Sequence, residues 1–202
     1  PGHIAADQRV ASDVGIAFDG DADRIWIVVP RVTILWGDYL LILYARDVLA
    51  RTGKGQSIIF DVECSPALPD AITKAGGVPV MWKTGHSLIK EKMKSAHAPL
   101  AGEMSGHMFF AEGFYGHDDA LYGAARILRI ISQADAAVHD LLSDIPTYHS
   151  TPEIRVDCPD DRKFDVVAAA TKHFKALYNA IYGDGVRLAS GCGRVRGRGT
   201  VR

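Results

Sequence analysis

The sequence predicts an α/β protein with a mixed or parallel sheet and βαβ units, followed by an incomplete α+β segment at its C-terminal end. Strand-length apolar stretches alternate with helix-length stretches between residues 57 and 95, which is typical of parallel sheets joined by helices. Glycines separate these stretches and mark where elements end. Of the 202 residues, 48% are hydrophobic and 23% are charged, which is an ordinary globular composition.

The first elements are two short strands on either side of an acidic turn. Residues 14–18 and 25–29 are apolar runs of strand length, and residues 19–24 between them carry three aspartates and one arginine. A helix is expected from Tyr39 to Ala50, because Gly53 follows it as a stop signal.

The βαβ unit follows this helix. The expected elements are a strand at 57–62, a helix at 66–75, a strand at 78–82 and a helix at 87–94. Ser65 is expected to cap the first of these helices, with Pro66 at its first position, and Ser87 is expected to cap the second.

The remaining elements close this unit and begin another. Residues 100–110 are expected to carry a glycine-rich loop, and the later elements are helices at 119–132 and 134–142, a linker at 146–152, a strand at 153–157, a helix at 164–182 and a strand that starts at 186. Trp26, Trp36 and Trp82 lie in or next to apolar runs, so we expect all three to pack in the core.

Charge and cysteine content argue against several classes of protein. The net charge is −1, which creates no overall field that attracts nucleic acid or a membrane. Cys64, Cys158 and Cys192 are widely spaced, which fits a reducing compartment better than a disulfide framework or a cysteine zinc site. No apolar run reaches the roughly 20 residues that span a bilayer, and the N-terminus does not resemble a signal peptide. We expect a cytoplasmic protein with no membrane and no nucleic-acid partner.

The strongest chemical signal is the acidic turn. Asp19, Asp21 and Asp23 alternate along it, so their carboxylates can converge on one hard cation such as Mg²⁺. An EF-hand is excluded, because Arg24 and Pro30 stand where that loop needs glycine and glutamate. A solvated acidic turn without a metal is the simpler alternative, although three carboxylates between apolar strands repel one another without a cation.

Arg24 extends this interpretation toward phosphate. A guanidinium beside a carboxylate-bound cation suits a phosphate group, which needs both neutralisation and paired donors. The alternative is a plain ion pair between Arg24 and an aspartate of the same turn.

Two further loops carry polar side chains. Residues 102–107 read Gly-Glu-Met-Ser-Gly-His, so Glu103, Ser105 and His107 offer acceptors and donors for sugar hydroxyls. Residues 83–87 read Lys-Thr-Gly-His-Ser and follow a strand of the βαβ unit, where ligands of such sheets bind. His86 is the candidate ligand contact in this second loop.

Taken together and in this order, the three loops resemble those of the α-D-phosphohexomutases. Residues 15–24 resemble the magnesium loop of that family, and residues 83–87 and 102–107 resemble the ligand loops of its third domain. The methionine at position 104 resembles the residue found there in the phosphomannomutase/phosphoglucomutase branch of the family. The resemblance runs from about residue 11 to residue 188 and implies the end of domain 2 at 1–33, domain 3 at 34–145, and a truncated or altered domain 4 at 151–202.

The resemblance implies reversible phosphoryl transfer between the 1 and 6 positions of a hexose phosphate, of either mannose or glucose, with a hexose 1,6-bisphosphate as intermediate and activator. It implies that the three aspartates bind Mg²⁺ and that Arg24 contacts the phosphoryl group. It implies substrate contacts from Gly85, His86, Glu103, Met104, Ser105, Gly106 and His107. The family's phosphoserine segment has no counterpart in this sequence, so we expect the isolated chain to lack turnover.

Two further departures from the family are visible. Glu63 stands where many relatives have lysine, which replaces an attraction for phosphate by a repulsion. After residue 188 the family continues to an Arg-Ser-Asn-Thr phosphate loop, whereas residues 187–202 here carry five arginines and no acidic residue. We interpret the tail as a shifted reading frame or sequence error, which the encoding DNA can test.

Two other functions remain as alternatives. One is a non-catalytic fragment that binds metal and sugar phosphate or supports a partner. The other is a nucleic-acid-binding remnant that uses the Arg/Gly tail, which the absence of interleaved aromatic residues disfavours. The sequence leaves the oligomeric state open.

Overall fold

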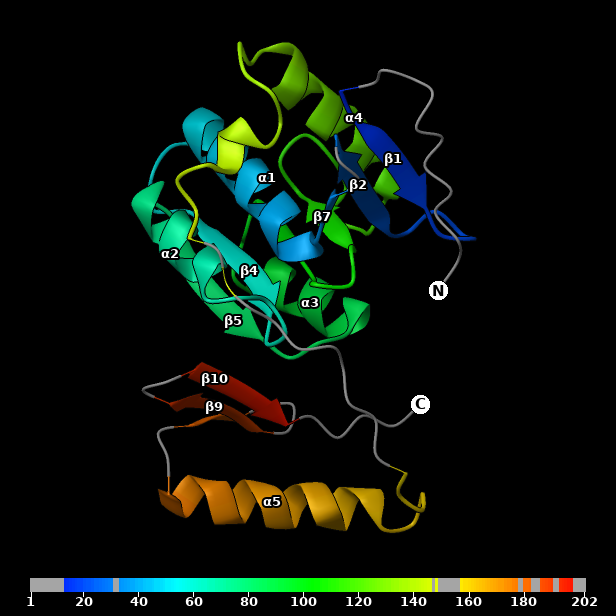
Figure 1. The fold of residues 1–202 in the computed structure, drawn as a ribbon, viewed down its shortest axis with the longest axis vertical. Helices are drawn as coiled ribbons and strands as arrows, with labels where there is room; N and C mark the ends of the chain where they lie inside the picture. Colours follow the sequence, from blue (N-terminus) through cyan, green and yellow to red (C-terminus); the bar gives the residue numbers. More distant parts are fainter. Residues whose placement is uncertain are drawn as a thin grey trace. The chain divides into compact units, whose positions relative to one another are not determined.

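The computed structural model describes residues 13–30, 33–146, 148, 157–177, 180–182, 186–190 and 193–197 (Figure 1). The chain divides into two compact units, Pro1–Tyr148 and His149–Arg202. The acidic turn lies in the first unit together with the βαβ elements. The finer division at residues 33 and 145 stays a prediction.

A small antiparallel sheet holds the acidic turn. Its strands are β1 (Gly15–Phe18), β2 (Ile25–Val29) and β3 (Thr33–Leu35), in that order. Alternate residues of β2 are buried, which fixes one face of this strand against the core. The first two strands are close to the predicted ranges. The third was not predicted, because three residues are too few to show a period of two.

The main sheet is mixed, as predicted. Its strands are β4 (Ser57–Asp61), β5 (Val78–Trp82), β6 (Leu100–Gly102) and β7 (Met108–Phe110), in the order β5-β4-β6-β7. Strand β4 is parallel to β5 and β6, and β7 is antiparallel to β6. Residues 100–110, expected to carry a glycine-rich loop, form a hairpin whose loop is residues 103–107. All six hairpin strand residues are buried, so burial rather than alternation specifies them.

Helices cover both faces of this sheet. Helices α1 (Gly37–Thr52) and α2 (Ala67–Lys74) lie on one face, where α4 (Ala120–Ser132) joins the same core; α3 (His86–Ser95) lies on the other. Side chains alternate along β4, so Ile58 and Phe60 pack with α1 and α2 whereas Ile59 packs with α3. The result is an α/β/α arrangement in which the acidic turn and the loops after the strands can meet.

The predicted helix at 134–142 is wrong. Only η1 (Asp140–Leu142), a single 3₁₀ turn, forms there. The segment is instead held from outside, because the Arg46 guanidinium donates to the Leu141 carbonyl at 2.6 Å and Val138 is buried. A nine-residue segment gains little from helix propagation, so these tertiary contacts decide its path.

Smaller expectations also fail. Trp36 is 51% exposed and Trp82 is 37% exposed, so neither is a core residue; the Lys92 ammonium lies 4.4 Å from the Trp82 ring centre. The N-cap residues of α2 and α3 are Pro66 and Gly85, and neither helix has a side-chain cap. The predicted caps at Ser65 and Ser87 are therefore wrong.

The second unit is an α+β piece. Helix α5 (Lys163–Leu177) contacts β8 (Ala180–Tyr182) and β9 (Val186–Ser190), and β9 also pairs with β10 (Gly193–Gly197). The helix predicted to reach residue 182 thus ends at 177, since residues 180–182 pair with 186–188 in an antiparallel hairpin. Residues 153–156 of the predicted strand lie outside the described residues. Within the described ranges, no helix is long and apolar enough to cross a membrane.

Candidate functional site

The acidic turn is a preformed acceptor of backbone hydrogen bonds. The Asp19 carboxylate accepts the amides of Asp23 and Arg24, both at 3.2 Å. The Ala22 amide donates to the Asp19 carbonyl at 3.3 Å, and Ala22 takes a left-handed backbone with φ of 59°. A non-glycine residue pays of the order of 1 kcal/mol for this conformation, so the rest of the turn must hold it in place.

The turn concentrates negative charge. Burial raises the pKa of Asp19, but the hydrogen bonds from Arg24 and Asp23 and the nearby guanidinium outweigh burial and bring the pKa below its ordinary value. The pKa of Asp23 lies above its ordinary value, because burial and the Asp19 carboxyl raise it more than His107 lowers it. One carboxylate of the turn is therefore stabilised and its neighbour is destabilised, which is the electrostatic demand a cation would relieve.

Backbone pairing joins this turn to the loop at residues 103–107. Arg24 and His107 form an isolated antiparallel bridge, and the Ile25 amide donates to the Gly106 carbonyl at 3.1 Å. Gly106 has a φ of 103°, and a Cβ atom there would lie 2.8 Å from the Ile25 carbonyl oxygen. Glycine is required by both conformation and space. Two segments 83 residues apart thereby become one structural element.

His107 is the centre of the joined site. Its side chain is 8% exposed, and its Nε2 atom lies 3.2 Å from Arg24 Nε and 3.3 Å from Asp23 Oδ2. Arginine Nε can only donate, so the hydrogen bond from Arg24 requires a neutral imidazole with its proton on Nδ1. Nδ1 then donates to Glu103 Oε2 at 2.7 Å.

The protonated form of His107 is also supported. Burial lowers the pKa of His107, but the hydrogen bond and charge of Glu103 and the charge of Asp23 outweigh burial and raise the pKa above its ordinary value. In that form the Nε2–H group faces Asp23 Oδ2, and Nε2 no longer accepts the hydrogen bond from Arg24. His107 can therefore exchange a proton at Nε2 while Glu103 holds the ring from Nδ1.

Glu103 connects the two ligand loops. It is buried, and its Oε1 atom accepts the Gly85 amide at 2.6 Å while Oε2 holds His107. Ser105 lies beside the same imidazole, with Oγ 3.1 Å from Nδ1. The predicted contacts of Glu103 and Ser105 with sugar hydroxyls stay a prediction, and the structure adds a positioning role for the Glu103 carboxylate.

Sequence reasoning missed Asp118 and Lys90. His86 stands at the start of α3 with a half-exposed side chain, and its Nδ1 atom lies 3.0 Å from Asp118 Oδ2. Lys90 Nζ donates to the other Asp118 oxygen at 3.0 Å. The His86 and His107 rings stack with centres 5.9 Å apart. Asp118 precedes α4 just outside any motif, so only the fold reveals that it belongs here.

Asp61, at the end of β4, was also missed. It is fully buried and accepts hydrogen bonds from the Cys64 thiol, the Thr84 hydroxyl and the Met104 amide. Burial raises its pKa to about 6, with the nearby charges of Glu63 and Glu103 adding to the effect and the Cys64 hydrogen bond opposing it. Asp61 therefore ties the loop after β4 to both predicted ligand loops.

The turn's residues fit a divalent cation. One carboxylate oxygen from each of Asp19, Asp21 and Asp23 lies within 4.8 Å of the others. Asp23 Oδ1 is buried and accepts no hydrogen bond among the described residues. An acceptor buried without a donor is costly, and an all-oxygen donor set suits Mg²⁺.

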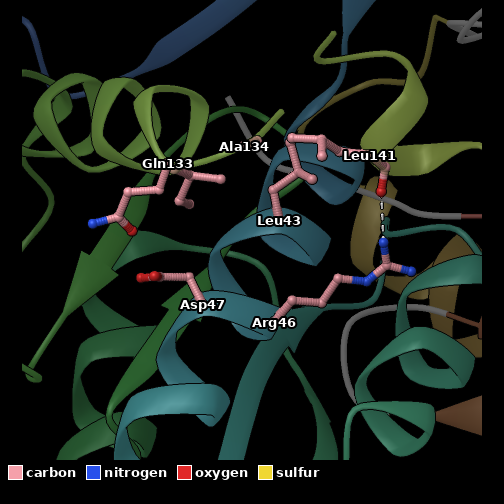
Figure 2. A pocket seen from close by; sticks show the side chains of 7 residues that line it. Leu43, Arg46, Asp47, Gln133, Ala134 and Leu141 are labelled. Carbon is pink, nitrogen blue, oxygen red and sulfur yellow. Dashed lines mark hydrogen bonds between the residues drawn. The ribbon is translucent and has the colours of Figure 1, made fainter. Parts of the chain in front are cut away.

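A separate hollow lies beside α1 (Figure 2). Its volume is about 290 Å³, and its lining residues are Leu43, Arg46, Asp47, Ile130, Gln133, Ala134 and Leu141. The charged groups here already have partners. The Arg46 guanidinium donates hydrogen bonds to the Leu141 carbonyl, drawn as the dashed line in Figure 2, and to the Asp144 carboxylate. The Asp47 carboxylate accepts hydrogen bonds from three arginines of α1 and α4. This hollow contains none of the predicted site residues.

Comparison with known proteins gives the class first. Residues 36–148 match the family model of the phosphoglucomutase/phosphomannomutase α/β/α domain III. This range contains both ligand loops and all four strands of the main sheet.

Similar proteins extend the match along the chain. The phosphomannomutase/phosphoglucomutase of Pseudomonas syringae is 46% identical over 98% of this chain. A solved phosphoglucomutase/phosphomannomutase family protein of Burkholderia thailandensis is 40% identical over 90% of the chain, with a TM-score of 0.78. The N-acetylphosphoglucosamine mutase of Aspergillus fumigatus, solved with GlcNAc-6P and magnesium, shares the fold at 14% identity over 93% of the chain, with a TM-score of 0.58.

The chain belongs to the phosphoglucomutase/phosphomannomutase family, the branch that its loops indicated. It spans only part of these proteins: 43% of the Pseudomonas relative, 38% of the Burkholderia chain and 45% of the Aspergillus chain. The Pseudomonas match leaves only about four of the 202 residues uncovered, so it extends into the arginine-rich tail. The reading-frame hypothesis for that tail stays a prediction that DNA must test.

Proposed function

We propose that this chain supplies the metal loop and the sugar-binding loops of a phosphohexomutase, which moves a phosphoryl group between the 1 and 6 positions of a hexose phosphate. The substrate is mannose or glucose phosphate, with a hexose 1,6-bisphosphate as intermediate. The phosphoserine that donates the phosphoryl group is proposed to lie outside these 202 residues.

One observation carries the proposal. Arg24, at the end of the acidic turn, and His107, at the end of the sugar loop, are paired by both backbone and side chain. A cation site, a guanidinium and a proton-transferring imidazole therefore share one small volume. This is the combination that phosphoryl transfer to a hydroxyl requires, because charge must be neutralised while a proton leaves or arrives.

Each residue then has a definable task. Asp19, Asp21 and Asp23 would hold Mg²⁺, which when bound would neutralise negative charge on the phosphoryl group. Arg24 is 44% exposed along its side chain and can turn its guanidinium toward phosphoryl oxygens. His107 takes or returns the hydroxyl proton at Nε2, while Glu103 fixes the ring through Nδ1.

The second ligand loop orients the sugar. The Gly85 amide is held by Glu103, so the position of the loop before α3 depends on the same carboxylate that orients His107. His86 presents a half-exposed ring beside His107 and can contact a hydroxyl or phosphate. Met104 and Gly106 shape the loop: the Met104 amide donates a hydrogen bond to the Asp61 carboxylate, and Gly106 has a left-handed backbone.

A mutase assay tests the proposal. The polypeptide that contains this chain and the phosphoserine segment would be assayed with glucose 1-phosphate and mannose 1-phosphate, with a bisphosphate activator and Mg²⁺. Asp21→Asn should lower turnover by at least about 100-fold, because it weakens the cation that offsets phosphoryl charge. Asp70→Asn, an exposed change on α2, should leave turnover unchanged. Equal turnover in both variants would refute the metal role.

The same assay decides the alternative of a non-catalytic fragment. Calorimetry of the 202-residue chain should show Mg²⁺ binding that Asp21→Asn removes, without turnover. If the longer polypeptide also binds metal and sugar phosphate without turning over, the binding-only alternative replaces the enzyme. Glu63 is the residue that favours this second outcome, since its charge repels a phosphate.

A further inference from the structure

We propose that Asp23, His107 and Asp118 form a second metal site, specific for a borderline divalent cation such as Zn²⁺ and distinct from the all-aspartate magnesium site. One ligand atom from each of the three residues lies within 4.8 Å of the others. The set contains one imidazole nitrogen and two carboxylate oxygens. Imidazole favours Zn²⁺ over Mg²⁺, whereas three carboxylates favour the reverse.

The imidazole is already oriented as a metal ligand. Glu103 Oε2 lies 2.7 Å from His107 Nδ1, which leaves Nε2 pointing at Asp23 Oδ2 at a distance of 3.3 Å. Histidines that bind zinc commonly donate their other ring proton to a carboxylate in this way. With metal–ligand bonds of about 2.0–2.1 Å, tetrahedral geometry separates two ligand atoms by about 3.3 Å. The pair is therefore spaced for a shared ion without rearrangement.

The second carboxylate is also held in place. The Asp118 side chain is 9% exposed and is fixed by His86 on one oxygen and Lys90 on the other. Burial raises the pKa of Asp118, but these two partners outweigh it and keep the pKa below its ordinary value. Asp23 has a buried oxygen, Oδ1, that accepts no hydrogen bond from the residues that the structure describes. The site thus combines a preoriented nitrogen, a fixed carboxylate and a carboxylate with unused acceptor capacity.

One group must move when the ion binds. The Arg24 Nε–H now occupies the lone pair of His107 Nε2, at 3.2 Å. The Arg24 side chain is 44% exposed, so it can rotate toward water while the ion takes its place. The charge around the site favours this exchange, because the carboxylates of the acidic turn, Glu103 and Asp118 outnumber the two cations Arg24 and Lys90.

This site would make zinc an inhibitor, a consequence that rests on the proposed function. Asp23 belongs to both donor sets, so Zn²⁺ on His107 withdraws one ligand from the magnesium site. It also occupies the His107 nitrogen that exchanges a proton and displaces Arg24. Zinc binding itself depends only on residues of this chain and stands whether or not the longer polypeptide is a mutase.

Calorimetric titration of the 202-residue chain with Zn²⁺ and, separately, Mg²⁺ provides the test. His107→Gln removes a direct ligand, so it should weaken Zn²⁺ binding by at least the roughly 10- to 100-fold that loss of a supporting group costs, and it should change Mg²⁺ binding less than about twofold. Asp21→Asn should do the opposite. Cys158→Ser, which removes an exposed thiol, should change neither affinity and serves as the control for thiolate binding. Circular dichroism confirms that each variant is folded.

Three results would overturn the proposal. The first is a folded His107→Gln chain that binds Zn²⁺ as tightly as wild type. The second is an Asp21→Asn chain that loses Zn²⁺ affinity and Mg²⁺ affinity equally. The third is loss of zinc binding in Cys158→Ser. If His107→Gln does not fold, nitrogen-edge NMR of the wild-type chain replaces it. Zn²⁺ should then shift the His107 ring resonances while Mg²⁺ does not, and unshifted resonances with bound zinc would equally overturn the site.

Discussion

Asp61→Asn should stabilise the first unit at neutral pH. Asp61 is fully buried, and burial together with the charges of Glu63 and Glu103 raises its pKa to about 6 from an ordinary 3.8. Asparagine fits the same contacts. Its oxygen can accept from Cys64 and the Met104 amide, and its amide can donate to the Thr84 hydroxyl.

The magnitude follows from the pKa shift. The folded state holds the Asp61 proton more tightly than the unfolded chain, so the free energy of unfolding falls as pH rises. The loss of stability caused by ionising the buried Asp61 carboxyl is absent below about pH 4 and complete above about pH 6. The difference between a pKa of 3.8 in the unfolded chain and one of about 6 in the folded protein corresponds to about 3 kcal/mol of unfolding free energy. Asparagine has no proton to lose and escapes the whole penalty.

Urea denaturation between pH 4 and pH 7.5, followed by tryptophan fluorescence, measures this effect. All three tryptophans lie in the first unit, so the signal reports that unit alone. The free-energy advantage of Asp61→Asn over wild type should grow from near zero at pH 4 to about 3 kcal/mol at pH 7. Glu63→Gln should remove part of the slope, since Glu63 is one cause of the raised pKa. An advantage that stays constant with pH, or shrinks as pH rises, would refute the reasoning.

Three further substitutions test the packing by the same denaturation method. Gly106→Ala should lower the free energy of unfolding by at least about 2 kcal/mol, because the new Cβ collides with Ile25 and the φ angle is unfavourable for alanine. Gly55→Ala has a similar φ but open space, so it should lower the free energy of unfolding by only about 1 kcal/mol. Equal losses would contradict the collision. Asp47→Asn should lower the free energy of unfolding by about 3 kcal/mol, because it leaves three guanidinium groups facing one another. This loss should exceed the loss on removing any one of the three arginines, and a smaller loss would contradict the reasoning. Tyr44→Phe should cost about 1 kcal/mol for the buried hydrogen bond to a helix carbonyl, and no loss would mean the bond contributes nothing.

The sequence predicts most elements of the first unit because burial follows regular patterns there. Strands β2, β4 and β5 are bounded by turn residues, and α4 begins at a true cap, the Asp119 carboxylate on the Tyr122 amide. The failures occur where partners distant in sequence decide. Residues 134–142 follow contacts with α1, and residues 180–182 pair with a strand instead of extending α5.

The site was predicted in its parts but not in its connections. Composition and spacing predict that the aspartates of the acidic turn bind a metal and that the histidines of residues 83–87 and 102–107 contact a ligand, since these residue types are informative on their own. No local pattern indicates that Arg24 meets His107, because backbone pairing across 83 residues creates that contact. Asp61 and Asp118 escaped notice for a related reason. Each is an aspartate beside an element end and outside any recognisable motif, so only folding brings it to the site.

The bridge between Arg24 and His107 limits how the proposed reaction can proceed. Since β2 and the hairpin loop are stitched together through their main chains, the cation site and the sugar loop cannot slide apart during turnover without breaking that pairing. A bisphosphate intermediate that must present first one phosphate and then the other would meet the acidic turn and the hairpin loop in the same relative position each time. In the proposed reaction, the sugar phosphate would therefore have to reorient while these two loops keep their relative position.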